Sequence, residues 1–455
     1  MDLWKLTAAE ALERLRSQEI TVEQYATSLL DRISKRDDDV KAWAYLDAGS
    51  ILAQARLMDK VPVSQRRQLH GVPVAVKDII LTQSEDNSRD VWRLSLIVPL
   101  DMPTEHGSII YKDSQPGIDA ASVALLREAG CLIFAKTTTT EFASSFIGTK
   151  TRNAHSVSHT PGGSSSGSGA AVADFQIPIA LGSQTMGSIV RPASYNGVYG
   201  FKPTHNVISR EGQKFCAPSF DTIGFFARSV ADIQLLADAF NLQDCDEGPY
   251  TDVKGLKFAV CTTVQWELAD EGTVKAMAKA VQLLRAHGAH VEELELGDDF
   301  DPVVTWHSQI TMTEAGATFL PEYRHSKNQL GERLIQWVND THRLTREEKL
   351  EAYDGLAALR PRFDKMADKY DAVIVPSVVG EAPEGLVVTG DPVLASTWTA
   401  LHVPVVNVPG FVGSNGMPIG LSMVAARLRD RHLLKVVEVA GRIFEREGGW
   451  SQRST

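Results

Sequence analysis

The fold is decided by two neighbouring stretches of sequence, Thr160-Pro-Gly-Gly-Ser-Ser-Ser-Gly-Ser-Gly169 and Leu181-Gly-Ser-Gln-Thr-Met-Gly-Ser-Ile-Val-Arg191. Residues 170–182 join them and pass from small residues suited to close packing into an apolar stretch that predicts a strand. A tract rich in glycine and serine alone favours a flexible loop, and a phosphate-binding P-loop would need a lysine that this tract lacks. The residues around the tract must therefore decide its role.

The serine that follows the predicted strand has the setting of a nucleophile. Ser188 comes after the small residue Gly187, where neighbouring backbone N–H groups can point at a developing oxyanion. No G-x-S-x-G pattern with a histidine partner is found nearby, so the serine needs another base. Lys77 is a candidate, because it lies in the short apolar stretch 71–80 and desolvation lowers the pKa of a buried lysine.

These stretches belong to a longer pattern that resembles the amidase signature family. The matching sequences are GVPVAVKD at 71–78, PGGSSSGS at 161–168, LGSQTMGSIVRPA at 181–193, GVYGFKPT at 197–204, SFDTIG at 219–224, ARSVAD at 227–232 and the late segment 410–424. The resemblance covers nearly the whole chain, and its combined motifs are highly specific. It implies an amide-cleaving enzyme that needs neither a cofactor nor a metal.

The resemblance assigns the catalytic roles residue by residue. Lys77 matches the general base, Ser164 the bridging serine and Ser188 the nucleophile. The backbone N–H groups of Thr185, Met186, Gly187 and Ser188 match the oxyanion hole. In family members the peptide bond before the bridging serine is cis, which here is the bond from Gly163 to Ser164.

Three further residues are candidate substrate contacts: Gly163, Gln184 and Arg191. In some family members an arginine at the position of Arg191 meets a substrate carboxylate, and a structural salt bridge is the alternative. Gln184 replaces the aspartate of many relatives, including tRNA-dependent amidotransferase subunits, which weighs against that function here. Met186 stands where relatives carry a small residue, so it is strained if the position needs a positive φ and otherwise narrows the pocket.

The expected architecture is a single α/β domain over 1–455, with a mixed central β-sheet covered by helices on both faces. A helical region at 1–60 precedes the signature core at 65–240 and a C-terminal α/β region at 250–445. Residues 81–99 have the character of an insertion, either a lineage-specific surface loop or a segment translated from a mis-annotated coding region.

Several helix boundaries can also be predicted. Thr7, Thr21 and Thr345 are each followed three residues later by a glutamate or glutamine, which is the pattern of a capping box at a helix start. Pro361 falls inside the helical pattern that begins at Thr345, so we expect a kink or a break there.

Composition sets the wider limits. The chain has 455 residues, 43% of them hydrophobic, and a net charge of −11, which disfavours nucleic acid and anionic membranes as partners. No secretory signal or membrane span is recognisable, and the four cysteines lack metal-ligand spacing, so we expect a cytoplasmic protein without a metal.

The sequence therefore predicts an enzyme that hydrolyses a small-molecule carboxamide to a carboxylate plus ammonia or an amine, through an acyl-enzyme on Ser188. Two alternatives stay open: an amidotransferase-type subunit that feeds ammonia to a partner, and a catalytically inactive amidase-like binding protein. The family resemblance also makes a homodimer an expectation.

Overall fold

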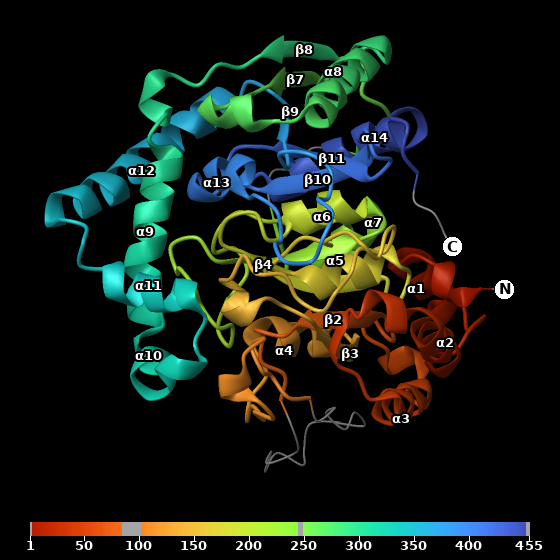
Figure 1. Cartoon of the computed structure of the whole chain (residues 1–455). Helices are drawn as coiled ribbons and strands as arrows, with labels where there is room; N and C mark the ends of the chain where they lie inside the picture. The colour runs from red at the N-terminus through yellow and green to blue at the C-terminus, as the bar shows by residue number, and fades with distance from the viewer. Residues whose placement is uncertain (1, 84–101, 244–248, 452–455) are drawn as a thin grey trace.

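One mixed sheet of 11 strands runs through the molecule, in the order β1-β3-β2-β4-β6-β5-β10-β11-β9-β7-β8 (Figure 1). A computed structural model describes residues 2–83, 102–243 and 249–451. The strands are β1 Trp43–Tyr45, β2 Pro73–Lys77, β3 Leu132–Thr137, β4 Ile179–Gln184, β5 Tyr199–Lys202, β6 Thr222–Ala227, β7 Lys257–Val260, β8 His290–Glu293, β9 Ala372–Pro376, β10 Val405–Val412 and β11 Pro418–Val424.

Both ends of this sheet contain parallel pairs, and its middle is antiparallel. Strand β2 pairs in parallel with β3 and β4, and β7 pairs in parallel with β8 and β9. Between them, β4, β6, β5, β10, β11 and β9 pair antiparallel in succession. Strands β5 and β10 join the first half of the chain to the second, so one continuous sheet holds both.

The helices are α1 Ala8–Arg16, α2 Val22–Val40, α3 Ala48–Asp59, α4 Ala121–Glu128, α5 Ser166–Ala173, α6 Val190–Asn196, α7 Val230–Ala239, α8 Glu271–Ala286, α9 Val303–Thr318, α10 Leu320–Ser326, α11 Glu332–Asp340, α12 Arg346–Ala367, α13 Val393–Ala400 and α14 Asp430–Glu447. Helices α9 to α12, in teal and cyan, gather at one side of the molecule (Figure 1). Within the described residues, no helix combines the length and the apolar character that crossing a bilayer requires.

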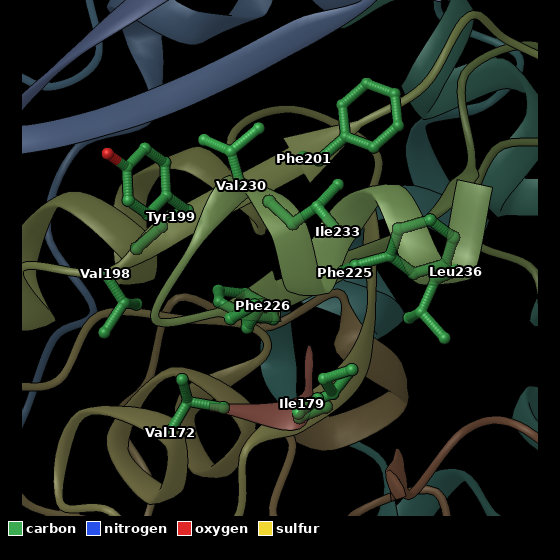
Figure 2. Close-up of a cluster of buried hydrophobic side chains, with 14 of the residues drawn as sticks. Val172, Ile179, Val198, Tyr199, Phe201, Phe225, Phe226, Val230, Ile233 and Leu236 are labelled. Atoms are coloured by element: carbon green, nitrogen blue, oxygen red, sulfur yellow. The ribbon is translucent and has the colours of Figure 1, made fainter. Parts of the chain in front are cut away.

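Strand β6 shows how both faces of the sheet are covered. Its two adjacent residues Phe225 and Phe226 are both fully buried, and successive residues of a strand point to opposite faces of the sheet (Figure 2). Phe225 stacks on Phe240 after α7, with ring centroids 5.4 Å apart. A Cβ at Gly182 would lie 2.5 Å from the Phe226 ring and 3.0 Å from Ser165 Oγ at the start of α5, so only glycine fits there. The predicted mixed sheet with helices on both faces is thus confirmed.

The predicted helix starts are confirmed, one local prediction is wrong, and of the kink or break expected at Pro361 the break does not occur. Complete capping boxes form at Thr7, Thr21 and Thr345. The helical region 1–60 also contains strand β1, which is only three residues long and too short to show alternation. Helix α12 runs through Pro361 without a break. Both Pro361 and Ala357, whose carbonyl loses its partner, are exposed, so water can solvate that carbonyl.

The insertion expected at 81–99 stays a prediction, and the structure describes only its first three residues. Residues 81–83 are bonded into the fold, since the Leu81 N–H donates to the Gly212 carbonyl at 2.9 Å. Residues 84–99 lie outside the described part of the chain. On either side of them, Thr82 Oγ1 donates to the Met102 carbonyl at 3.2 Å, so the two flanks lie side by side. Lys136 supports both flanks by donating to the Ile80 carbonyl and to Thr104 Oγ1, each at 2.7 Å.

Candidate active site

The site lies where two parallel strands end. Lys77 is the last residue of β2, and Gln184 is the last residue of β4. Because β2 and β4 are parallel neighbours, both end at the same edge of the sheet. The Lys77 amine accordingly lies 2.9 Å from Ser183 Oγ at the end of β4. The chain between these strands returns to the same edge in the Gly/Ser tract, which supplies Ser164 and Ser165.

The Lys77 amine is surrounded by hydroxyl groups. Its Nζ lies 2.7 Å from Ser164 Oγ and 2.9 Å from Ser165 Oγ, in addition to Ser183. The side chain is fully buried, and no carboxylate among the described residues forms a salt bridge with it. Burial lowers the pKa of Lys77 well below its usual value, and the more distant Asp221 opposes this shift only in part. A neutral amine beside a hydroxyl can accept its proton.

The bridging position has the expected backbone. The peptide bond from Gly163 to Ser164 is cis, as predicted. The Gly163 carbonyl accepts two hydrogen bonds from the Arg191 guanidinium, at 2.7 Å from Nη2 and 3.2 Å from Nε. A Cβ at Gly163 would lie 2.7 Å from Thr389 Cγ2, so the position has no room for a side chain. Arg191 therefore ties helix α6, which follows Ser188, to the residue before Ser164.

Ser188 lies in the turn between β4 and α6. The backbone N–H groups of the four predicted residues, Thr185, Met186, Gly187 and Ser188, have no hydrogen-bond acceptor among the described residues. Consecutive free donors beside a serine hydroxyl, above all the three of Met186, Gly187 and Ser188, are the arrangement that an oxyanion needs. Met186 does not adopt a positive φ, so the strain considered for this residue is absent.

A cavity opens at Ser188. It is lined by Ala143, Ser144, Ser145, Phe146, Thr185, Met186, Ser188, Arg191, Cys216, Thr311, Arg333 and Trp337. Met186 thus forms part of the cavity wall, in line with the expectation that its side chain narrows the pocket. Most of the other lining residues come from segments that carry none of the recognised motifs. The cavity therefore joins the motif residues to side chains that the sequence pattern did not single out.

The two arginines of this cavity differ in their bonding. Arg191 forms no salt bridge with a described carboxylate, so the predicted structural salt bridge is wrong; its Nη1 donates to the Gly390 carbonyl at 2.5 Å. Arg333 lies over the rings of Phe146 and Trp337, at 3.7 and 4.6 Å from their centroids. Within the described chain, its buried Nε has no partner and its guanidinium makes no hydrogen bond or salt bridge.

The structure places Gln184 away from the cavity, which contradicts the expected substrate contact. Its side chain is 1% exposed. Its Oε1 accepts the N–H groups of Ile189 at 2.8 Å and Val190 at 3.1 Å, and its Nε2 donates to Thr399 Oγ1 at 2.9 Å. The chain turns directly from Ser188 into α6, whose first N–H groups need an acceptor, and Gln184 supplies it.

Several site residues were missed from the sequence. Ser165 and Ser183 surround the Lys77 amine, but serines near a motif give no signal of which one turns inward. Arg333, His307 and Thr399 come from α11, α9 and α13, outside the recognised motifs. In contrast, the described residues hold no group of three or more His, Cys, Asp or Glu side chains placed to bind a metal ion.

The fold and site define an α/β protein with a buried lysine–serine pair and a second serine at a cavity. The family model described as Amidase matches residues 96–434, and the chain belongs to this family. Lys77 lies before the matched residues, so its role depends on the geometry above.

Relatives and solved structures agree with this family over nearly full length. The A subunit of glutamyl-tRNA(Gln) amidotransferase from Acidothermus cellulolyticus is 30% identical, covering 96% of this chain and 94% of the relative. The corresponding protein of Agathobacter rectalis is 28% identical, covering 96% and 93%. A crystal structure of an amidase is 27% identical with a TM-score of 0.82, covering 98% of this chain and 100% of that one. The crystal structure of the Thermotoga maritima A subunit is 26% identical with a TM-score of 0.76, covering 99% and 96%.

The lowered pKa of Lys77 predicts a specific pH dependence. If only the neutral amine accepts a proton, the rate at which a fluorophosphonate labels Ser188 should rise with pH as Lys77 loses its proton. Because burial lowers the pKa of Lys77, the midpoint should lie well below the value of about 10.4 for an exposed lysine. Labelling rates measured from pH 5 to pH 11 test this. A midpoint near 10 would contradict the assignment of Lys77 as the base.

Proposed function

We propose that the protein hydrolyses the carboxamide bond of a small molecule, giving a carboxylate and ammonia or an amine. The observation that carries this proposal is the buried Lys77 amine, 2.7 Å from Ser164 Oγ and without a carboxylate partner among the described residues. An amine in this state has the free electron pair that a general base needs. Membership of the amidase family supports the same chemistry.

In the proposed reaction, Ser188 Oγ attacks the amide carbon while its proton passes to Ser164 and the Ser164 proton passes to neutral Lys77. The free N–H groups of Met186, Gly187 and Ser188 stabilise the oxyanion that forms. The C–N bond then breaks as the proton returns through Ser164 to the leaving nitrogen. Water adds to the acyl-enzyme with the same proton relay, and the carboxylate leaves as the Ser188 hydroxyl is restored.

A role as an amidotransferase subunit is the second candidate, and the names of the similar curated relatives favour it. In that role the chain would deliver ammonia to a partner protein. Gln184 does not decide between the two functions, because its buried amide bonds the start of α6 outside the cavity. The two functions differ in one measurable respect, because an independent amidase releases ammonia without a partner.

The first experiment incubates the purified chain with a panel of aliphatic, aryl and carboxylate-bearing amides and measures ammonia or amine release, alongside fluorophosphonate labelling. We expect release by the chain alone. Ser188→Ala and Lys77→Ala should abolish turnover, and Ser164→Ala should leave a small residual rate, because relay residues act as a unit. Near-normal turnover by folded Lys77→Ala would refute the relay.

A matched control comes from the same serine tract. Ser168 Oγ donates to the Leu181 carbonyl at 2.8 Å and does not contact Lys77, so Ser168→Ala should keep the activity. An unlabelled wild-type protein would instead support the inactive binding protein. Labelling without ammonia release from any amide would favour the amidotransferase role.

The cavity also favours an amide that carries an anionic group. Arg333 presents a guanidinium with no partner among the described residues, held between two rings that limit its movement. Arg191, the other cation of the cavity, already directs all three of its nitrogens to the carbonyls of Gly163 and Gly390. A partly buried cation without an ion-pair partner is more stable beside an anion. Arg333 is therefore the expected contact for a substrate carboxylate.

We predict that Arg333→Met raises KM for carboxylate-bearing amides by about 10- to 100-fold, the range expected from losing a hydrogen bond to a charged group. The KM for neutral amides should change little. Arg343→Met is the matched control, because Arg343 pairs with Asp340 on the surface and its side chain is 74% exposed. Equal losses for neutral and anionic amides would contradict the assignment.

A further inference from the structure

We propose that His307 and Thr399 are positioning residues that fix the three free backbone N–H groups beside Ser188 in the orientation an oxyanion requires. This inference rests on the proposed function. Each residue lies far from Ser188 in sequence, on α9 and α13, and neither belongs to a recognised motif. The carbonyl groups of the turn determine where its N–H groups point, because in a trans peptide the C=O and N–H groups point in opposite directions.

His307 holds the first of these peptides. Its Nε2 lies 2.8 Å from the Thr185 carbonyl, and because a carbonyl only accepts, Nε2 must carry the hydrogen. The other ring nitrogen, Nδ1, is buried without a partner among the described residues, and burial lowers the pKa of His307 to about 4. The ring stacks on Phe220 with centroids 4.2 Å apart. With the Thr185 carbonyl held by His307, the Met186 N–H points away from α9.

Thr399 holds the second peptide. Its Oγ1 lies 2.7 Å from the Met186 carbonyl and 3.3 Å from the Ala395 carbonyl, so its single hydrogen is directed to the closer Met186. The same hydroxyl accepts from Gln184 Nε2 at 2.9 Å. Gln184 is itself oriented by the N–H groups that its Oε1 accepts at the start of α6. The direction of every donor in this chain of hydrogen bonds is therefore set, and the Gly187 N–H points away from Thr399.

The third peptide is held by the helix itself, since the Gly187 carbonyl accepts the Arg191 N–H at 2.9 Å. All three carbonyls of the turn thus have a donor in the protein, while the three N–H groups of Met186, Gly187 and Ser188 have no acceptor within the described chain. Donors that are oriented before the reaction need no reorganisation when the oxyanion forms. Two of the three orientations depend on the side chains of His307 and Thr399.

The test compares paired variants by the kinetics of fluorophosphonate labelling, whose phosphoryl oxygen stands in for the oxyanion. His307→Leu and Thr399→Val remove the hydrogen-bond donor, whereas His307→Gln and Thr399→Ser keep one in place. We expect the first pair to slow the bond-forming step by at least about tenfold, towards the 10²–10³ that loss of an oxyanion donor costs. Reversible binding of the probe should stay the same, and the conservative variants should restore most of the rate.

A matched control uses another buried histidine that contacts a backbone carbonyl. His70 Nε2 lies 3.1 Å from the Met58 carbonyl, so His70→Leu loses a comparable bond outside the site and should keep the wild-type rate. If His307→Leu does not fold, the comparison of the labelling rates of Thr399→Val and Thr399→Ser tests the inference alone. Wild-type labelling with unchanged rates in the donor-free variants would overturn this inference and leave the proposed function intact. Equal losses in donor-free and conservative variants would also overturn it. A wild-type protein that the probe does not label would overturn both.

Discussion

Burying an amine without an opposite charge is the constraint on which this site depends. Transferring an isolated ammonium out of water is so costly that a buried lysine loses its proton instead. Lys77 ends strand β2 and is fully buried, and its nearest polar neighbours are the hydroxyls of Ser164, Ser165 and Ser183. These hydroxyls form hydrogen bonds with the amine but carry no negative charge that would favour its protonated form. The electron pair of the amine thus stays available to a proton.

Two other buried lysines show what distinguishes Lys77. Lys136, on the adjacent strand β3, lies 3.6 Å from an Asp78 oxygen, and burial lowers its pKa to about 8. Lys202, whose pKa burial lowers to about 7, donates to the carbonyls of Pro203 and Val403. A carboxylate favours the charged amine, and a carbonyl has no proton to give. Among these three lysines, only Lys77 combines a hydroxyl that can pass on a proton with the absence of a paired carboxylate.

The sequence predicted the features that local chemistry controls and those that the family motifs carry. The capping boxes follow from side chains three residues apart, whereas the Lys77–Ser164 contact and the cis bond before Ser164 follow from residues matched to the family. It failed for side chains whose partners neither local chemistry nor the motifs specify. Gln184 was expected to face substrate, but the N–H groups of α6 turned its amide inward. Arg191 likewise bonds to the carbonyls of Gly163 and Gly390 and forms no salt bridge with a described carboxylate, while its contact with a substrate carboxylate stays a prediction.

Other features lay beyond any local pattern. His307, Thr399 and Arg333 come from three helices that pack near the turn at Ser188. The periodicity of the sequence does not reveal this packing, and single residues of these types are common on helices, so nothing marked them as part of the site. A kink or a break was expected at Pro361, and α12 is not broken there, because solvent exposure makes the lost hydrogen bond tolerable. The residues that surround the candidate site thus come from α9, α11 and α13, while the motifs supply the groups proposed to react.

The most direct test of this account is the protonation state of Lys77 itself. NMR of protein labelled with ¹³C at lysine Cε, with the Lys77 signal assigned through Lys77→Gln, reports the charge of the amine during a titration. A buried Lys77 amine without an ion-pair partner should lose its charge at a pH well below that at which the exposed lysines, with pKa values of about 10.4, lose theirs. A Lys77 signal that stays charged and titrates together with the exposed lysines would contradict this.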